Sequence, residues 1–116
     1  MDEYKLTLRR LALRDDRYID ALLGEERANV TLAGIDSRSH ALTRVAALIA
    51  LDAAPASYMS AVEAGLNAGA THDEIVGTLI AVMPIVGVAR VVAAAPNLGL
   101  ALGYDVNEAL EVLDGA

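Results

Sequence analysis

The sequence contains no cysteine, no phenylalanine and no tryptophan, and only four tyrosines. Without cysteine the chain cannot form a disulfide, a thiolate metal site, a cysteine nucleophile or a dithiol redox pair. Basic residues are also few. Nine lysines and arginines stand against sixteen aspartates and glutamates, which gives a net charge of −7. We therefore do not expect the chain to bind nucleic acid or an anionic membrane surface.

A long uncharged segment is also lacking. The most apolar region, residues 77–102, contains Pro84, Arg90 and Pro96. The uncharged segments on either side of Arg90 are too short to cross a bilayer. The first residues, MDEYKLTLRR, lack the apolar core of a signal peptide. We therefore expect a cytoplasmic protein that does not enter the membrane.

Aliphatic residues supply the apolar surface. Hydrophobic residues make up 55% of the 116 positions, and small aliphatic side chains suit close helix packing better than a wide sheet core. A chain of this length is expected to form a single domain, residues 1–116. So much apolar surface is hard to bury within one short copy. We therefore expect a homo-oligomer that assembles through helix faces.

Residues 57–86 are predicted to form a helical hairpin. Met59, Val62 and Leu66 form one stripe of an amphipathic helix. Gly69 ends that helix, because glycine tolerates the left-handed conformation found at helix ends. Thr71 and Glu74 have the spacing of a capping box, which starts the second helix. The apolar face of the second helix is predicted to consist of Ile75, Val76, Leu79, Ile80 and Met83.

Helical spacing of apolar residues continues on both sides of the hairpin, and no strand pattern is present. The chain is therefore predicted to be all-α, with about six to seven helices. A break or kink is expected at Pro84 and Gly87, and Pro96 could break the following helix. Before the hairpin, helices are expected over residues 2–13, from Asp15 or Asp16 to Gly24, and from the N-cap Asp36 to about Asp52, with residues 25–35 as a connecting segment. The first helix of the hairpin is expected to begin at Pro55. After the hairpin, helices are expected over residues 88–102 and after Asp105.

The order of these elements resembles a known family. The run Gly34-Ile35-Asp36, a helix rich in alanine and leucine, and the segment AVEAGLNAGATHDEIVGTLIAV are similar to the carboxymuconolactone decarboxylase family, which includes the AhpD-like alkylhydroperoxidases. The resemblance covers about residues 34–102, between N-terminal helices in 1–33 and a C-terminal helix in 103–116. It implies an all-helical subunit that assembles into a trimer or hexamer, with its site between helices near subunit contacts.

The redox chemistry of that family does not carry over to this chain. Its redox-active members resemble one another in a CxxCxxxH pattern, whose positions fall here on Ala54, Ser57 and Ala61. The activating glutamate of the family falls near Ala41 or Leu42. A serine hydroxyl is far too weakly acidic to replace a thiolate, and no second sulfur is present. Peroxidase activity by the cysteine route is therefore excluded, whereas the decarboxylase branch of the family stays open.

Two residues of the third predicted helix are candidates for a site. His40 and Arg44 are four residues apart and share one helix face. They could form an anion-binding pair in which His40 acts as acid or base near neutral pH. The alternative is a solvated face, because Asp36 and Arg38 lie close by. His72, in the first turn of a capped helix, is predicted to lie on the surface.

Arg90 is the one charged residue between residues 77 and 102. If its guanidinium is buried, it requires a carboxylate or several acceptors. One interpretation is structural: Arg90 pairs with Asp52, Glu63 or an acid of a neighbouring subunit, or its head reaches solvent. The other is functional: Arg90 holds the carboxylate of a substrate inside the helical domain.

Ser57 and Tyr58 stand where the family keeps its reactive groups. Tyr58 could donate a hydrogen bond into a pocket, although such a ring often packs in the core with its hydroxyl in water. Two functional hypotheses follow. One is a cofactor-free lyase for a small carboxylated or lactone-like compound, in which Arg90 holds the acid and His40 or Tyr58 transfers the proton. The alternative is a catalytically silent oligomeric scaffold or small-molecule binding protein. Neither requires a metal.

Overall fold

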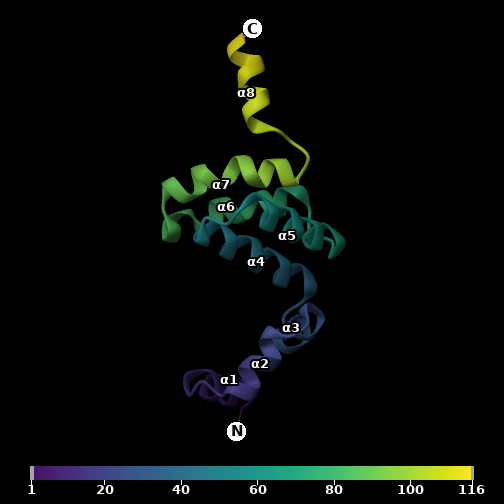
Figure 1. Cartoon of the computed structure of the whole chain (residues 1–116), viewed down its shortest axis with the longest axis vertical. Helices are drawn as coiled ribbons and strands as arrows, with labels where there is room; N and C mark the ends of the chain where they lie inside the picture. Colours follow the sequence, from purple (N-terminus) through teal and green to yellow (C-terminus); the bar gives the residue numbers. More distant parts are fainter. Residues whose placement is uncertain (1, 116) are drawn as a thin grey trace. The chain divides into compact units, whose positions relative to one another are not determined.

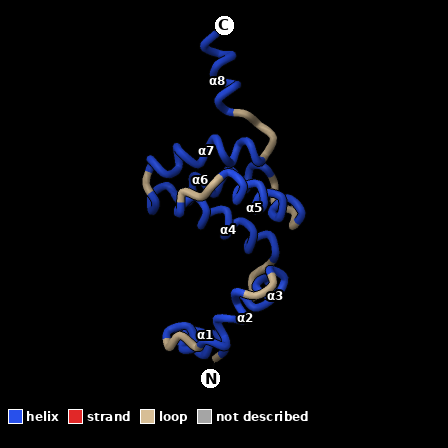
Figure 2. Tube along the Cα trace, viewed as in Figure 1, coloured by secondary structure: helices blue, strands red, loops and turns tan. Residues whose placement is uncertain are grey.

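A computed structural model describes the backbone of residues 2–115 and the side chains of residues 2–113. Within these residues it contains eight α-helices and no strand (Figure 2). The predicted all-α class is confirmed. The helices are α1 (Glu3–Ala12), α2 (Asp16–Leu23), α3 (Glu26–Ala33), α4 (Ser37–Leu51), α5 (Pro55–Asn67), α6 (His72–Val86), α7 (Val88–Ala101) and α8 (Val106–Gly115).

The contacts divide the chain into two compact units. The first ends at Asp36 and contains α1, α2 and α3, and the second begins at Ser37 and contains α4 to α8. Among the described residues, none of the helices combines the length and the apolar character needed to cross a membrane.

The first unit contains one helix more than predicted. The interpretation of residues 25–35 as a connecting segment is wrong, because α3 occupies most of that range. Asn29, which indicated a loop, donates a hydrogen bond from Nδ2 to the carbonyl oxygen of Leu22 at 2.8 Å and so ties α3 to α2. Gly34, at φ 71°, ends α3 in the left-handed conformation. The added helix raises the number from the expected six or seven to eight.

None of the side chains of residues 2–36 is fully buried. The apolar stripe of α1 consists of Tyr4, Leu8 and Leu11, which remain 62%, 59% and 45% exposed. α2 begins as predicted, with the Asp15 side chain accepting a hydrogen bond from the Tyr18 amide. The first unit therefore has amphipathic helices but no core of its own.

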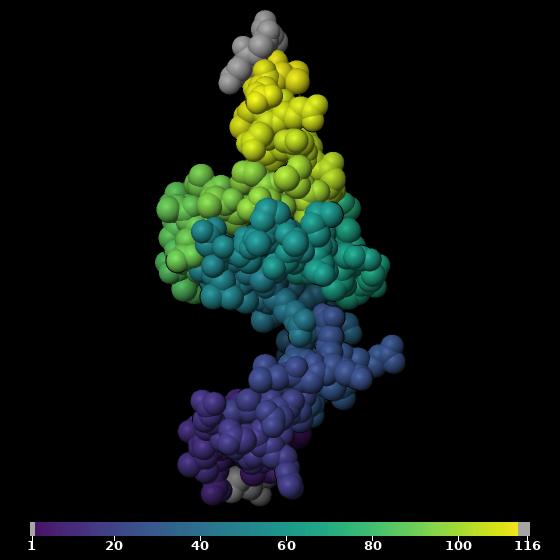
Figure 3. Space-filling view, viewed as in Figure 1, coloured from purple at the N-terminus to yellow at the C-terminus, as the bar shows by residue number. Residues whose placement is uncertain are grey.

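The core of the second unit lies among α4, α5, α6 and α7, which pack against one another (Figure 1). α8 contacts only α7 among the described helices, and it stands out from the packed helices of the second unit in the space-filling view (Figure 3). The buried core consists of Val45, Ile49, Tyr58, Val62, Ala70, Ile75, Leu79, Val91, Ala94 and Leu98.

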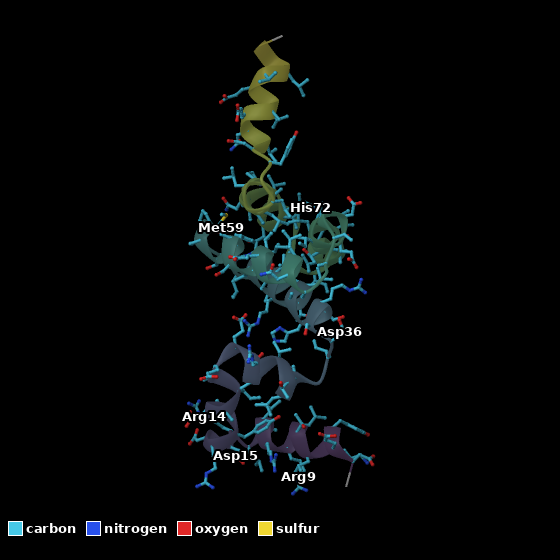
Figure 4. All side chains as sticks on the ribbon, turned by 90° about the vertical axis from the view of Figure 1, so that its right-hand side faces the viewer. Arg9, Arg14, Asp15, Asp36, Met59 and His72 are labelled. Carbon is cyan, nitrogen blue, oxygen red and sulfur yellow. The ribbon has the colours of Figure 1, made fainter. Side chains whose placement is uncertain are left out.

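The hairpin is confirmed, but its first helix is rotated from the predicted orientation. α5 buries Tyr58, Val62 and Gly65, whereas Met59 is 55% exposed and lies at the surface (Figure 4). Val62 belongs to two neighbouring stripes of α5, one with Met59 and one with Tyr58 and Gly65. The helical periodicity of the sequence does not show which of the two stripes is buried. The stripe with Gly65 is the one that faces the neighbouring helices, since a Cβ on Gly65 would be in van der Waals contact with Ile75 at 3.6 Å and with Ala41 at 3.8 Å.

The prolines in the apolar region do not end helices. α6 continues through Pro84 to Val86, and α7 continues through Pro96 to Ala101. The predicted interruption comes at Gly87, whose φ of 93° is a conformation that favours glycine. The long apolar region is thus two helices joined by one glycine.

The start of α6 is held by the predicted capping box. The Glu74 amide donates to Thr71 Oγ1 at 3.0 Å, and the Thr71 amide donates to Glu74 Oε1 at 2.9 Å. The other oxygen of Glu74 lies 3.0 Å from Nη1 of Arg38, in the first turn of α4. The hydrogen bond from the Thr71 backbone and the positive charge of Arg38 lower the pKa of Glu74. The box therefore ties the first turn of α6 to the first turn of α4.

Replacing Thr71 by alanine removes one hydrogen bond of the box. Thr71→Ala is expected to lower the free energy of unfolding by about 1 kcal/mol, because an amide at the helix start loses its acceptor. Thr71→Ser keeps the acceptor and is the matched control. Urea denaturation followed by circular dichroism measures both, and equal losses in the two variants would contradict the capping role.

The lowered pKa of Glu74 predicts a pH dependence. A carboxylate with a depressed pKa in the folded state stabilises the protein fully above its unfolded pKa. This contribution disappears as the pH falls through the folded pKa. The stability difference between the wild type and Glu74→Gln should therefore be largest near neutral pH and vanish in the acid range below the ordinary glutamate pKa. Thermal unfolding of both proteins across pH tests this, and a constant difference would refute it.

Candidate functional site

The five predicted site residues lie on three helices that pack against one another (Figure 1). His40 and Arg44 belong to α4, Ser57 and Tyr58 to the first turn of α5, and Arg90 to the first turn of α7. The packing does not gather all five at one place: Ala41, next to His40, lies 3.8 Å from the position of a Cβ on Gly65, in the second half of α5, whereas Ser57 and Tyr58 begin α5 beside the end of α4. Burial then separates the residues: His40 and Tyr58 are buried, Arg44 is half-buried, and Ser57 and Arg90 are exposed.

Tyr58 is the most unusual of the five. It is 1% exposed and belongs to the core. Its hydroxyl oxygen is buried and has no hydrogen-bond partner among the described residues. A buried hydroxyl without a partner costs free energy, so most proteins avoid one. Tyr58 therefore marks a position where the core carries an unused hydrogen-bond donor.

The environment of Tyr58 keeps its hydroxyl protonated. Burial raises the pKa of Tyr58, and the negative charge of Asp52 raises it further. The phenol is therefore neutral throughout the physiological range. A neutral phenol donates a hydrogen bond, for example to a carbonyl or carboxylate oxygen, and it does not act as a base.

Asp52 owes its place to the turn between α4 and α5. Its φ is 53°, a left-handed conformation that aspartate tolerates better than most residues. The amides of Asp52 and Ala53 donate to the carbonyls of Ile49 and Leu48, which closes the end of α4. Pro55 then opens α5 at its first position, as predicted. From the sequence, Asp52 was predicted as the end of a helix and as a possible partner for Arg90, but not as a charge that acts on Tyr58.

His40 does not lie on a solvated face, because it is only 7% exposed. It follows the core side of α4, whose other buried residues are Ala41, Val45 and Ile49. Arg44, one turn further along, is half-buried. The pair shares a helix face as predicted, but His40 is enclosed rather than presented to solvent.

Arg90 is not buried in the single chain. Arg90 is exposed, and no ion pair joins it to another side chain within residues 2–113. The reason is its phase on α7: the helix buries Val91, Ala94 and Leu98, and the residue before Val91 points about 100° away from it. Of the alternatives that the sequence left open, the structure shows the guanidinium exposed to solvent.

The start of α5 offers no nucleophile with a base. Ser57 is exposed, and its backbone amide donates to the carbonyl of Ala54 at 3.0 Å. The resemblance places the redox motif on Ala54, Ser57 and Ala61, and of these only Ser57 has a hydroxyl group. No group of three histidine, aspartate or glutamate side chains in the described part of the chain could hold a metal ion. His72 is exposed, as predicted, and belongs to no such group.

An open hollow lies where α7 leads into α8, and the sequence analysis did not predict it. It contains none of the five predicted site residues, and its charged side chains are carboxylates. Its lining residues are Gly103, Tyr104, Asp105, Glu108, Ala109, Val112 and Leu113. Asp105 is engaged as a helix cap, since it accepts a hydrogen bond from the Glu108 amide at 3.0 Å. The predicted cap of the last helix is therefore confirmed.

Comparison of the chain with models of protein families, with curated proteins and with solved structures finds no match. The functional argument therefore depends on the geometry of the chain itself, and above all on Tyr58.

The unpaired hydroxyl of Tyr58 predicts an unusual stability effect. Tyr58→Phe should leave the free energy of unfolding unchanged or raise it by about 1 kcal/mol, because the change removes a buried polar group that has no partner. Tyr58→Ala, which also removes the ring, should cost about 3–5 kcal/mol. Urea denaturation distinguishes the two. A loss of more than about 1 kcal/mol in Tyr58→Phe would show that the hydroxyl has a partner.

Proposed function

We propose that this chain is a cysteine-free relative of the carboxymuconolactone decarboxylases that binds a small carboxylated or lactone-like compound at Tyr58. The proposal includes assembly into a homo-oligomer, a trimer or hexamer. Two features support the kinship. The helices α4, α5 and α6 follow one another in the order that the resemblance implies, and the joint between α5 and α6 contains the complete Thr71–Glu74 capping box.

The observation that carries the proposal is the buried, unpartnered hydroxyl of Tyr58. A ligand oxygen that accepted a hydrogen bond from this group would remove the cost of leaving it unpaired. The raised pKa of Tyr58 favours an acceptor ligand, because the neutral phenol keeps its proton. A carboxylate, lactone or ketone oxygen meets this requirement.

A ligand would reach the Tyr58 hydroxyl through the turn between α4 and α5. The charge of Asp52 acts on the Tyr58 hydroxyl, which places the hydroxyl near this turn. The turn is short and non-helical, and Ala54 is exposed. A shift of residues 52–54 would open the hydroxyl to a ligand without disturbing the helices.

The other predicted residues have narrower roles in this proposal. Arg90 supplies a positive charge on the surface of α7, which packs against α5. Such a charge attracts an anionic ligand and can pair with its carboxylate. Ser57 offers an exposed hydroxyl next to Tyr58 in the chain, whereas His40 belongs to the start of α4, which lies beside the second half of α5, away from Tyr58. No cofactor is required, and the cysteine route to peroxide reduction stays excluded.

The second candidate function is a catalytically silent oligomeric scaffold or small-molecule binding protein. One observation favours it over a carboxy-lyase. Arg90 is exposed whereas His40 is enclosed, so the single chain does not present the two as one polar cluster. The carboxy-lyase remains the enzymatic form of the proposal, with the Tyr58 phenol as proton donor.

Binding of small carboxylic acids tests the proposal. A series of aromatic and lactone acids, with their neutral methyl esters, is titrated into the full chain by calorimetry. Tyr58→Phe should weaken the binding of acids and esters alike by about tenfold or more, because both lose the phenol donor. Arg90→Gln should weaken only the acids. Turnover is followed in the same samples by release of carbon dioxide.

Tyr104→Phe is the matched control, since Tyr104 is 59% exposed and lies outside the three helices of the site. It should bind every compound as the wild type does. Unchanged binding in Tyr58→Phe would refute the site, and an absence of binding to the whole series would refute the function.

A further inference from the structure

The outward side of α6 is apolar and uncovered in the single chain. By helical spacing it consists of Val76, Gly77, Ile80, Ala81 and Pro84, which we call the α6 outer face. Ile80 is 70% exposed and Val76 is 42% exposed. Both residues belong to the apolar face predicted for this helix, and the fold divides that face: α6 buries Ile75 and Leu79, while Val76 and Ile80 stay exposed. α6 therefore has apolar residues on two sides, and the core uses one of them.

The α6 outer face carries no charge beyond the first turn of the helix. No charged residue occurs between Glu74 and Arg90, in a chain whose net charge is −7. Ile85 and Val88 continue the apolar surface at the end of α6, with 87% and 62% of their surface exposed. Together these side chains expose several hundred Å² of apolar surface, and patches of that size mark interaction sites.

Gly77 points to close approach by another helix. A Cβ added at this position would meet nothing within 4 Å, so packing inside the chain does not require glycine there. A glycine inside a helix is destabilising relative to alanine. With Ala81 one turn further on, Gly77 leaves a shallow groove along α6 into which a large side chain of a second helix fits.

We propose that the α6 outer face of one copy packs against the same face of a second copy. The absence of charge on the α6 outer face favours a second copy over a charged partner. Two uncharged faces meet without like-charge repulsion, although each chain is strongly acidic, whereas a charged partner would find no counter-charge there. The face is also self-complementary, because Ile80 of each copy can enter the groove at Gly77 and Ala81 of the other.

A contact of this kind is isologous and has two-fold symmetry. A stable interface buries about 800 Å² on each partner, and the exposed part of the α6 outer face with Ile85 and Val88 supplies a large share of that area. Of the two assemblies in the proposed function, a two-fold contact selects the hexamer, in which trimers pair. The inference thus rests on the proposed homo-oligomer and assigns the surface through which its copies meet.

The test is the mass of the full chain in solution by sedimentation velocity over a dilution series. The wild type should sediment above the monomer mass. Ile80→Glu should raise the dissociation constant by about tenfold or more, because it places a charge at the centre of the contact. Met59→Glu, which introduces the same charge at a 55% exposed position on α5, is the matched control and should sediment as the wild type does.

Gly77→Leu gives a second, steric test, since its side chain enters open space in the single chain but fills the groove between copies. It should dissociate the assembly while the helical signal in circular dichroism is kept. A monomeric wild type overturns both the inference and the proposed oligomer. An assembled wild type with assembled Ile80→Glu and Gly77→Leu overturns the inference alone, and so does equal dissociation by Met59→Glu. Ligand binding at Tyr58 is measured in a separate titration, so none of these outcomes bears on it.

Discussion

The reciprocal hydrogen bonds between Thr71 and Glu74 are the constraint on which the second unit depends. They set the residue at which α6 begins, and the ion pair of Glu74 with Arg38 relates that point to the start of α4. Once both starts are set, the buried residues of the two helices fall into register, with Ile75 beside Gly65 of α5. The α5–α6 joint is therefore short, and beyond its first turn α6 carries no charged side chain.

This packing has two consequences for function. It encloses the ring of Tyr58 completely, so that its hydroxyl is left in the core without a partner and with a raised pKa. It also turns the far side of α6 outward with its isoleucine and valine exposed. Both features are unfavourable in an isolated chain. A ligand oxygen would relieve the first and a second copy would relieve the second, which is why we propose binding at Tyr58 and assembly through α6.

The first unit shows that local sequence signals can predict helices even where none of the described side chains is fully buried. α1 and α2 begin and end close to the predicted residues, because their caps and apolar spacing are local features. α3 was missed because Asn29, Thr31 and Gly34 are residues common in loops. Its stability depends on a side-chain bond from Asn29 to α2, and no periodicity reveals such a contact. For the candidate site, too, the sequence predicted the helix that carries each residue. It did not predict that Arg90 is exposed and that His40 is buried.

The sequence by itself determined the all-α class, the absence of thiol chemistry, the hairpin with its capping box and the caps at Asp15 and Asp105. All of these depend on residue type or on neighbours within one turn of helix. Only the tertiary structure decided which of two adjacent stripes each helix buries. Val62 belongs to both stripes of α5, and α6 is apolar on nearly every side, so local spacing does not distinguish them. That choice depends on which neighbouring helices each stripe faces in the fold, as where Gly65 faces Ile75, ten residues further along the chain.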